Sequence, residues 1–357
     1  MPKQPTIHDV AKKCGFSKST VSLVLQNSDE IPDATKAAVH KAIAQIGYRH
    51  NRFARSLRTR RSHAVGIIVQ DLLNPFYIEI IKHIEQLLRK RGYDLIVTSS
   101  NTDPDLELPV IERLVALQAD GLIVSTMDYE RVAPRLQSIQ SRGTHCVIAG
   151  PAYPGIPFDG AGIDDADAMR DAMEHLFALG HRDIGFIWGA PPFQSIGARF
   201  EVFRAALGKA GLSVHEEWVM HCGFRLQDGY EAAKALLSRK KRPSAVFALN
   251  DVLAMATIRA ARDLGLSVPG DISVVGVDNI ELGSFFCPSL TTIASPITAY
   301  AEALAEMTLK GIEKTNANAA DTPDESTPKR RKQAESKAER VVLRSELIVR
   351  ESTGKSA

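Results

Sequence analysis

The sequence lacks the features that mark secreted, metal-binding and membrane proteins. Its four cysteines, Cys14, Cys146, Cys222 and Cys287, stand singly and form no CxxC pair, which favours reduced, buried thiols over disulfides or a zinc site. No stretch approaches ~18 uninterrupted apolar residues, and the N-terminus has no apolar segment typical of a secretion signal. We therefore expect a cytoplasmic protein with no metal, no cofactor and no membrane partner.

Motifs that carry enzyme chemistry are also missing. HEEWVMH holds His215 and His221 too far apart for an HExxH zinc helix. GAGIDD lacks the third glycine of a dinucleotide-binding fingerprint, and the terminal TGKSA has Val349 where a P-loop needs glycine. No GxSxG motif occurs. These absences predict that the protein is not an enzyme, although α/β clefts host many chemistries.

The charge of the chain is unevenly distributed. Its 357 residues exceed one ordinary core, so two or three domains are expected. Residues 1–63 hold 12 Lys and Arg against 4 Asp and Glu, which leaves 32 basic and 38 acidic residues for the rest. A small basic head on an acidic body indicates a polyanion partner at the N-terminus.

Three short helices are predicted in the basic head. Thr6 can cap a first helix that ends at Gly15. Ser17 can cap a second helix directly after the turn CGFSKST, and a third helix ends at Gly47. This order matches a helix-turn-helix, with a generic small helical bundle as the alternative.

The second helix carries one apolar residue on its polar side. Val21, Val24 and Leu25 fall on a core-facing stripe. Leu23 points the other way, into a face of serines and glutamine. A single surface leucine needs no explanation by itself, so the alternative is a face that a partner covers.

Residues 6–71, from TIHDVAKKCGFSKSTVSLVLQN to AVGIIVQD, resemble the DNA-binding head and hinge of the LacI/GalR family of bacterial repressors. The resemblance implies an all-α helix-turn-helix domain at 1–49, whose second helix enters the major groove. Lys18 and Ser19 would hydrogen-bond bases there, and Leu23 would pack on a thymine methyl. The family more often has a basic or hydrogen-bonding residue at the Leu23 position. The predicted DNA contacts of the head are Thr6, Ser17, Lys18, Ser19, Thr20, Ser22, Leu23 and Asn27.

The arginine-rich run NRFARSLRTRRSH follows the head. Such a run is usually a solvated linker, but ARSL resembles the family's hinge helix, predicted here within residues 50–62. That helix lies in the minor groove, where Leu57 would unstack a base step and kink the duplex. His50 departs from the family, which often has proline there. The predicted contacts of the hinge are Arg52, Ala54, Arg55, Leu57 and Arg58.

Beyond the hinge, short buried runs alternate with amphipathic helices. AVGIIVQ, YDLIVTSS, ADGLIVST and THCVIAG read as parallel strands of one unit, and DIGFIWG, EWVMHCG, SAVFALN and DISVVGVD as those of a second. We predict a two-lobed α/β body of doubly wound parallel sheets at 63–357, which resembles the periplasmic sugar-binding proteins. Its ligand would bind at the carboxyl ends of the strands.

Each predicted lobe draws on two stretches of the chain. The first lobe spans about 63–162 and 293–313, and the second about 163–292 and 340–353. The intervening stretch, about 314–339, has a composition that cannot bury a core and is predicted to be a flexible insertion. Its KRRK is a possible polyanion contact, with a solvated loop as the simpler interpretation. No leucine heptad follows Thr353, so we expect a dimer.

Polar and aromatic residues follow the predicted strands. By motif position, Arg199, Asn250 and Asp278 match polar effector contacts of the family. The alternatives are a surface helix position for Arg199 and helix capping for Asp278. A guanidinium, an amide and a carboxylate among aromatic rings suit a polyhydroxylated ligand such as a sugar. The predicted effector-binding residues are Asp71, Phe76, Tyr77, Phe193, Ser195, Arg199, Phe224, Asn250 and Asp278, with Asn74 and Asp251 as further candidates.

Two departures from the family restrict the range of ligands expected for the effector site. Ala149 and Gly150 stand where many relatives carry Asp-Arg, and Phe193 stands where a purine-binding relative has arginine. The sequence thus predicts a homodimeric transcriptional repressor that reads a palindromic operator in double-stranded DNA under the control of a small, sugar-like effector. The alternative is a sugar-binding or sugar-modifying α/β protein with an incidental basic head.

Overall fold

The structure, a computed structural model, describes residues 5–25, 28, 30–48, 61–150, 156–189, 194–320 and 338–356, with the backbone alone for 194–196 and 318–320. The chain divides into two compact units, a head at Met1–Ser62 and a body at His63–Ala357. None of the helices in these ranges combines the length and apolar character that a membrane span requires.

The head consists of three helices, α1 (Ile7–Cys14), α2 (Lys18–Leu25) and α3 (Asp33–Ile46). The main-chain N–H and the hydroxyl of Thr6 both donate to the Asp9 carboxylate at 2.8 Å, which fixes the start of α1. The Ser17 hydroxyl accepts from the Thr20 N–H at 3.0 Å at the start of α2. Gly15 and Gly47, at φ of 76° and 66°, end α1 and α3 in the left-handed conformation. The predicted caps and stops of the head are confirmed.

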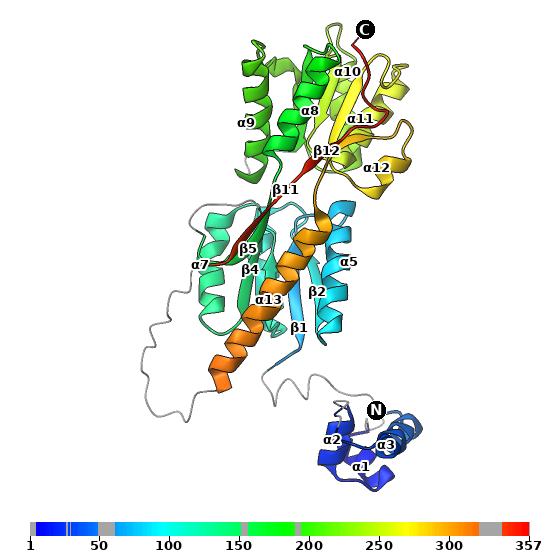
Figure 1. Ribbon diagram of the computed structural model, residues 1–357, viewed down its shortest axis with the longest axis vertical. Helices are drawn as coiled ribbons and strands as arrows, with labels where there is room; N and C mark the ends of the chain where they lie inside the picture. The colour runs from blue at the N-terminus through cyan, green and yellow to red at the C-terminus, as the bar shows by residue number, and fades with distance from the viewer. Residues whose placement is uncertain are drawn as a thin grey trace. The chain divides into compact units, whose positions relative to one another are not determined.

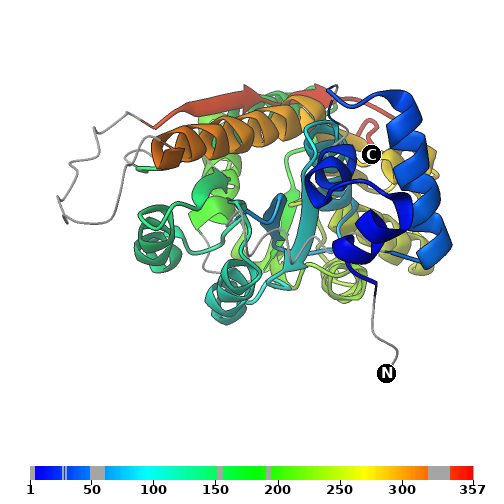
Figure 2. The ribbon, with the colours of Figure 1, turned by 90° about the horizontal axis from the view of Figure 1, so that it is seen from below.

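The first lobe of the body is a six-stranded, entirely parallel sheet in the order β11-β5-β4-β3-β1-β2. Its strands are β1 (Ala64–Val69), β2 (Asp94–Ser99), β3 (Gly121–Val124), β4 (His145–Ala149), β5 (Asp159–Asp164) and β11 (Arg340–Arg344). Because strand side chains alternate between faces, α5 (Pro75–Lys90) and α13 (Ile297–Ala320) cover one face, and α6 (Pro104–Ala116) and α7 (Tyr129–Gln140) cover the other. Figure 2 shows α13 running alongside β11.

The second lobe has the strand order β12-β10-β9-β8-β6-β7, with β12 antiparallel to β10 and the other pairs parallel. Its strands are β6 (Ile184–Gly189), β7 (Val219–Cys222), β8 (Ala245–Ala248), β9 (Ser273–Asp278), β10 (Thr291–Ala294) and β12 (Glu346–Ile348). The helices α8 (Ala166–Ala178) and α9 (Gln194–Lys209) cover one face, and α10 (Leu226–Leu237) and α11 (Asp251–Asp263) the other. The short elements η1 (Glu216–Trp218) and α12 (Glu281–Phe285) lie in loops.

The two lobes are joined by three crossover segments of the described chain, at 164–166, 294–297 and 344–346. Figure 1 shows β11 and β12 as one continuous run that passes from the first lobe into the second. At the third crossover, Ser345 separates the two strands and its N–H donates to the Asp164 carbonyl at 3.2 Å. Because β5 and β11 of the first sheet and β10 of the second end at these crossovers, the carboxyl ends of the parallel strands in both sheets lie at the junction of the lobes.

Four predicted boundaries are wrong. The prediction gives residues 340–344 and 163–164 to the second lobe, but they belong to β11 and β5, which pair in the first sheet. It gives residues 293–294 to the first lobe, but they belong to β10 of the second sheet. It begins the flexible insertion at about 314, but α13 continues to Ala320. Short strands such as β10 and β11 carry no signal for the sheet that they join, because pairing depends on the whole fold.

Candidate functional site

In the head, the predicted base-reading face is separate from the core. Val21 and Val24 are buried in the cluster that holds the three helices together. Lys18 and Ser19 are exposed, and Leu23 is half-buried outside that cluster. The predicted contact Asn27 and the hinge contacts Arg52, Ala54, Arg55, Leu57 and Arg58 lie outside the described residues. On α2, Leu23 thus lies on the polar side of the helix, outside the core of the head.

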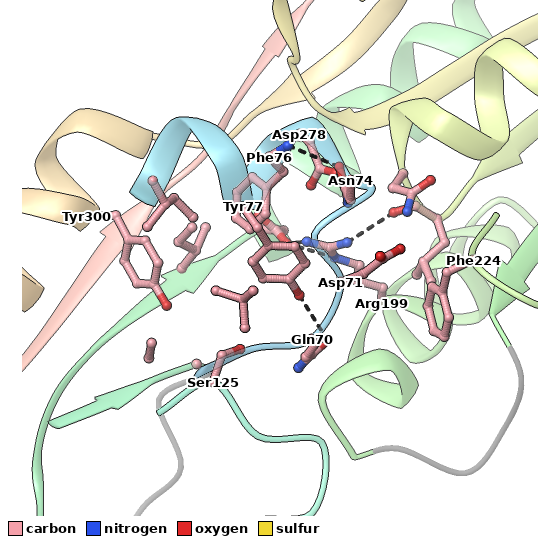
Figure 3. Close-up of a pocket in the computed structure, with 18 of the residues that line it drawn as sticks. Gln70, Asp71, Asn74, Phe76, Tyr77, Ser125, Arg199, Phe224, Asp278 and Tyr300 are labelled. Carbon is pink, nitrogen blue, oxygen red and sulfur yellow. Dashed lines mark hydrogen bonds and ion pairs between the residues drawn. The ribbon is translucent and has the colours of Figure 1, made fainter. Parts of the chain in front are cut away.

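In the body, a cavity of about 420 Å³ lies where the carboxyl ends of strands from both lobes meet. Gln70 follows β1 and Ser125 follows β3 of the first lobe, while Asn250 follows β8 and Asp278 ends β9 of the second. Figure 3 shows labelled residues from both lobes around this one space. Its volume falls in the range of small-molecule sites, roughly 300–1,000 Å³.

The first lobe supplies mainly neutral polar and aromatic groups to the cavity. Asn74 begins α5, where its side-chain oxygen accepts from the Phe76 N–H at 3.0 Å. The Tyr77 hydroxyl donates to the Gln70 side-chain oxygen at 2.9 Å. The Phe76 ring packs against the cores of both lobes and meets the Tyr77 ring edge-on, with centroids 5.2 Å apart. Burial raises the pKa of Tyr77, so its hydroxyl stays protonated.

The second lobe supplies the charged groups. The Arg199 guanidinium, on α9, donates through Nε and Nη2 to one oxygen of Asp165 at 2.8 and 2.5 Å, and through Nη1 to the Leu249 carbonyl at 3.0 Å. The other oxygen of Asp165 accepts from the Ser345 hydroxyl at 2.6 Å. Burial lowers the pKa of Arg199, but Asp165 and Asp278 outweigh that effect and the pKa is raised overall. Arg199 is therefore a fixed, permanent cation and not a surface helix arginine.

Asp278 is the buried carboxyl group at the other side of this cation. It is 4% exposed and has a φ of 115°, a conformation that non-glycine residues adopt rarely. The Asn74 side-chain amide donates to it across the lobe junction at 3.4 Å, as the dashed line in Figure 3 marks. Burial raises the pKa of Asp278 well above its usual range, although Arg199 opposes the shift. A strained, buried carboxyl group at a cavity wall is typical of a functional site.

Asp251 holds the turn that carries Asp278, and it does not line the cavity. Its carboxylate is fully buried, accepting from the Thr292 hydroxyl at 2.5 Å and from the Ile280 N–H at 2.9 Å. Burial raises the pKa of Asp251 to about 7. Of the two further candidates for effector binding, Asn74 lines the cavity, whereas Asp251 only stabilises the turn that carries Asp278.

Seven of the nine predicted effector residues line the cavity: Asp71, Phe76, Tyr77, Arg199, Phe224, Asn250 and Asp278. Phe193 lies outside the described residues, and only the backbone of Ser195 is described, in α9. Phe224 lies against Gly189, where a Cβ would collide with its ring. Asn250 also caps α11, accepting from the Leu253 N–H at 2.9 Å, which leaves its amide N–H groups for a ligand.

Sequence reasoning misses further residues that line the cavity, among them Gln70, Ser125, Asp165 and Tyr300. Gln70 and Ser125 directly follow β1 and β3, but the predicted strands AVGIIVQ and ADGLIVST include them, so they are read as strand residues. Asp165 follows β5, a short glycine-containing strand that was not predicted. Tyr300 lies on α13 at the spacing of the core residues, and its pattern gave no signal of a cavity. The described residues hold no group of three or more side chains suited to a metal ion.

A helix-turn-helix head with a two-lobed, cavity-bearing body defines the transcriptional regulators that carry an effector-binding domain. A family model described as bacterial regulatory proteins of the lacI family matches residues 6–51, and one described as a periplasmic binding protein-like domain matches residues 173–353. The chain belongs to the LacI family of bacterial regulatory proteins, which confirms the predicted family, its class of fold and its role in transcription regulation without an enzymatic activity.

Relatives and solved structures agree with this assignment. The chain is 36% identical over 293 residues to the HTH-type transcriptional regulator DegA of Bacillus subtilis, covering 82% of this chain and 87% of that protein. It is 36% identical over 294 residues to the HTH-type transcriptional repressor PurR of Pectobacterium carotovorum, covering 82% and 85%. It is similar to the regulator CelR in complex with cellobiose, at 27% identity and a TM-score of 0.66 over 98% of this chain and all of that one. The fold also matches the operator-bound lac repressor dimer, at 22% identity and a TM-score of 0.80 over 99% of this chain and all of that one.

Proposed function

We propose that the protein is a dimeric, cytoplasmic repressor whose affinity for a palindromic operator is set by a small, hydroxyl-rich effector. The observation that carries this proposal is the cavity at the lobe junction, which combines Arg199, Asp278 and Asn250 with aromatic walls. A ligand that touches both lobes stabilises one lobe arrangement over another, and it changes operator affinity by that difference alone.

The donors and acceptors of the cavity support a sugar or a related polyol as the effector. Arg199 and the Asn250 amide can donate, and Asp278 can accept from hydroxyl groups. The rings of Phe76, Tyr77 and Phe224 offer flat apolar surface to the C–H faces of a sugar ring. The likeness to a regulator whose structure was solved in complex with cellobiose points the same way.

The head supports sequence-specific reading through α2. Lys18 suits the acceptors of guanine, Ser19 suits either base edge, and Leu23 suits a thymine methyl. The exposed and half-buried positions of these side chains leave them available to a DNA groove. Phosphate contacts from the arginine-rich hinge at 50–62, with Leu57 as a minor-groove wedge, would complete the interface.

A dimer is supported by exposed apolar side chains on one side of the body. Leu73, in the turn before α5, and Ile78, on α5, are 74% and 47% exposed, and Phe285, on α12, is 81% exposed. Val97 lies on β2, the edge strand of the first sheet. Figure 1 shows α5 and β2 of the first lobe on the same side of the body as α12 of the second. Apolar patches of this kind are typical of protein–protein interfaces.

An operator titration tests the proposal directly. The full-length protein is titrated against DNA from its own upstream region at moderate salt, with unrelated DNA of equal length as the control. Mono- and disaccharides, polyols and nucleobases are then added to the complex. We expect sequence-preferring binding that a sugar-like compound changes. Equal affinity for both DNAs would reject the repressor role, and a response to a nucleobase alone would reject the sugar-like effector.

A further inference from the structure

The Arg199 guanidinium has two groups of N–H donors with different partners. Of its five N–H groups, two are taken by Asp165 and one by the Leu249 carbonyl. The other two have no acceptor among the described residues, and the side chain lines the cavity. Arg199 can therefore donate two hydrogen bonds to a ligand, while its positive charge is already paired with Asp165.

Asp165 is built into the structure as that charge partner. Its side chain is 9% exposed, and it stands at the first crossover segment, directly after β5. The Ser345 hydroxyl, at the third crossover, holds the second carboxylate oxygen at 2.6 Å. With one oxygen held by Ser345 and the other by Arg199, the carboxylate cannot turn away without losing both contacts.

Apart from Arg199 and the tyrosines, the ionisable groups of the described residues that line the cavity are carboxyl groups, as Asp165 is. Arg199 is the only cationic side chain among the described residues that line the cavity. Three further carboxyl groups line it, those of Asp71, Asp164 and Asp278. An anionic ligand would lose its hydration and would meet one already paired cation and several acidic groups, which is unfavourable at low dielectric.

We infer that Asp165 is a specificity-determining residue: by pairing with Arg199 it restricts the effector to uncharged sugars, polyols or glycosides and excludes sugar phosphates, uronic acids and aldonic acids. This inference rests on the proposed effector site. The guanidinium then serves as a pair of directed donors for neighbouring hydroxyl oxygens and not as an anion receptor.

Sulfate is the probe that tests the inference without knowledge of the effector. The thermal midpoint of the full-length protein is measured against sulfate, with chloride at equal ionic strength as the reference. Asp165→Asn/Asp278→Asn leaves Arg199 without its ion-pair partner Asp165 and without the nearby Asp278 carboxyl group, and should give saturable stabilisation by sulfate. We expect sulfate to bind this variant roughly tenfold or more tighter than it binds the wild type, the scale of one charge-assisted hydrogen bond. Adding Arg199→Gln should abolish the gain.

Two controls separate charge from packing. Ser345→Ala removes the support of Asp165 but keeps both charges, so it should ignore sulfate as the wild type does. Sulfate stabilisation of the wild type that disappears in Arg199→Gln would overturn the inference. The absence of any gain in the folded double variant would overturn it as well.

The unmodified protein provides a second arm that needs no variant to fold. Matched sets of glucose, glucuronate and glucose 6-phosphate, and the corresponding galactose compounds, are compared for thermal stabilisation and operator release. Stabilisation by neutral members alone, or by none of them together with indifference to sulfate, supports the inference. Preferential stabilisation by an anionic member overturns it. Loss of all effector control would reject the proposed function, while the sulfate series would still report the charge state at Arg199.

Discussion

The head and the body place their functional side chains in opposite environments. In the head, Lys18 and Ser19 are exposed on α2, and the core is made by other residues such as Val21 and Val24. In the body, the Asp165 and Asp278 carboxyl groups at the cavity are buried, and Asp165 is hydrogen-bonded to Ser345 at the third crossover. Substitutions on the face of the head should therefore change binding with little effect on stability, whereas substitutions in the body should change both.

The largest expected effect lies behind the cavity. Asp251→Ala removes the acceptor of the Ile280 N–H and of the Thr292 hydroxyl in a fully buried place. We expect a loss of roughly 2–4 kcal/mol in the free energy of unfolding of the body at about pH 6, because two buried donors lose their partner. Denaturant unfolding measures it. Asp251→Asn, which keeps a side-chain oxygen for Ile280, is the control and should lose much less.

Arg199→Ala should have the next largest effect, and on regulation. It should abolish the response to effector, a change of roughly 5- to 150-fold in apparent operator affinity, while effector-free operator binding stays close to normal. Operator titrations with and without effector measure this. Arg204→Ala, an exposed arginine on the same helix paired with Glu201, is the matched control. A full response in the Arg199 variant would remove that residue from the site.

The stability of the body should depend on pH through Asp251. Its pKa is raised from 3.8 to about 7, so the folded chain holds the proton more tightly than the unfolded chain. Its contribution to stability is complete below about pH 4 and is lost as the pH rises through 7, with a slope of at most about 1.4 kcal/mol per pH unit. His181, whose pKa burial lowers, acts in the opposite direction. The difference in unfolding free energy between wild type and Asp251→Asn isolates the aspartate, and a difference that is flat from about pH 5 to 7 would contradict the shift.

The smallest expected effect is in the head. Leu23→Ala should cost about 1 kcal/mol at one operator position, most visibly at a thymine, with the thermal stability of the protein unchanged. Leu25→Ala is its counterpart, because Leu25 packs against the core of the head and its loss should lower stability. Competition binding with single-base operator variants measures the first, and thermal denaturation measures the second. A stability loss in Leu23→Ala equal to that in Leu25→Ala would place Leu23 in the core.

The sequence predicts the head more completely than the body, because the head depends on local contacts and the body on contacts between distant parts of the chain. Helix caps are local, so Thr6, Gly15 and Ser17 could be read correctly from neighbouring residues. Arg199 and Asp278 could be found because they follow recognisable strands and match a family pattern. Asp165 could not, because its role depends on Ser345, which is 180 positions away along the chain. Contacts between the crossovers arise only when both sheets have formed, and no local pattern records them.

The pairing of β11 with β5 has a consequence for synthesis on the ribosome. The face of the first sheet that α13 covers includes Val65 and Val147, which are made early. The α13 residues that bury their part of this face, among them Leu304 and Ile312, are made only after the whole central part of the second sheet, although α5 on the same face is made early. The edge strand β11 comes later still. The first lobe, although it begins first, is therefore completed only after almost all of the second lobe has been made. Until the C-terminal stretch emerges, the nascent chain carries an apolar sheet face that α5 covers only in part and an unpaired edge at β5, the kind of surface that chaperones bind and that aggregates when left alone.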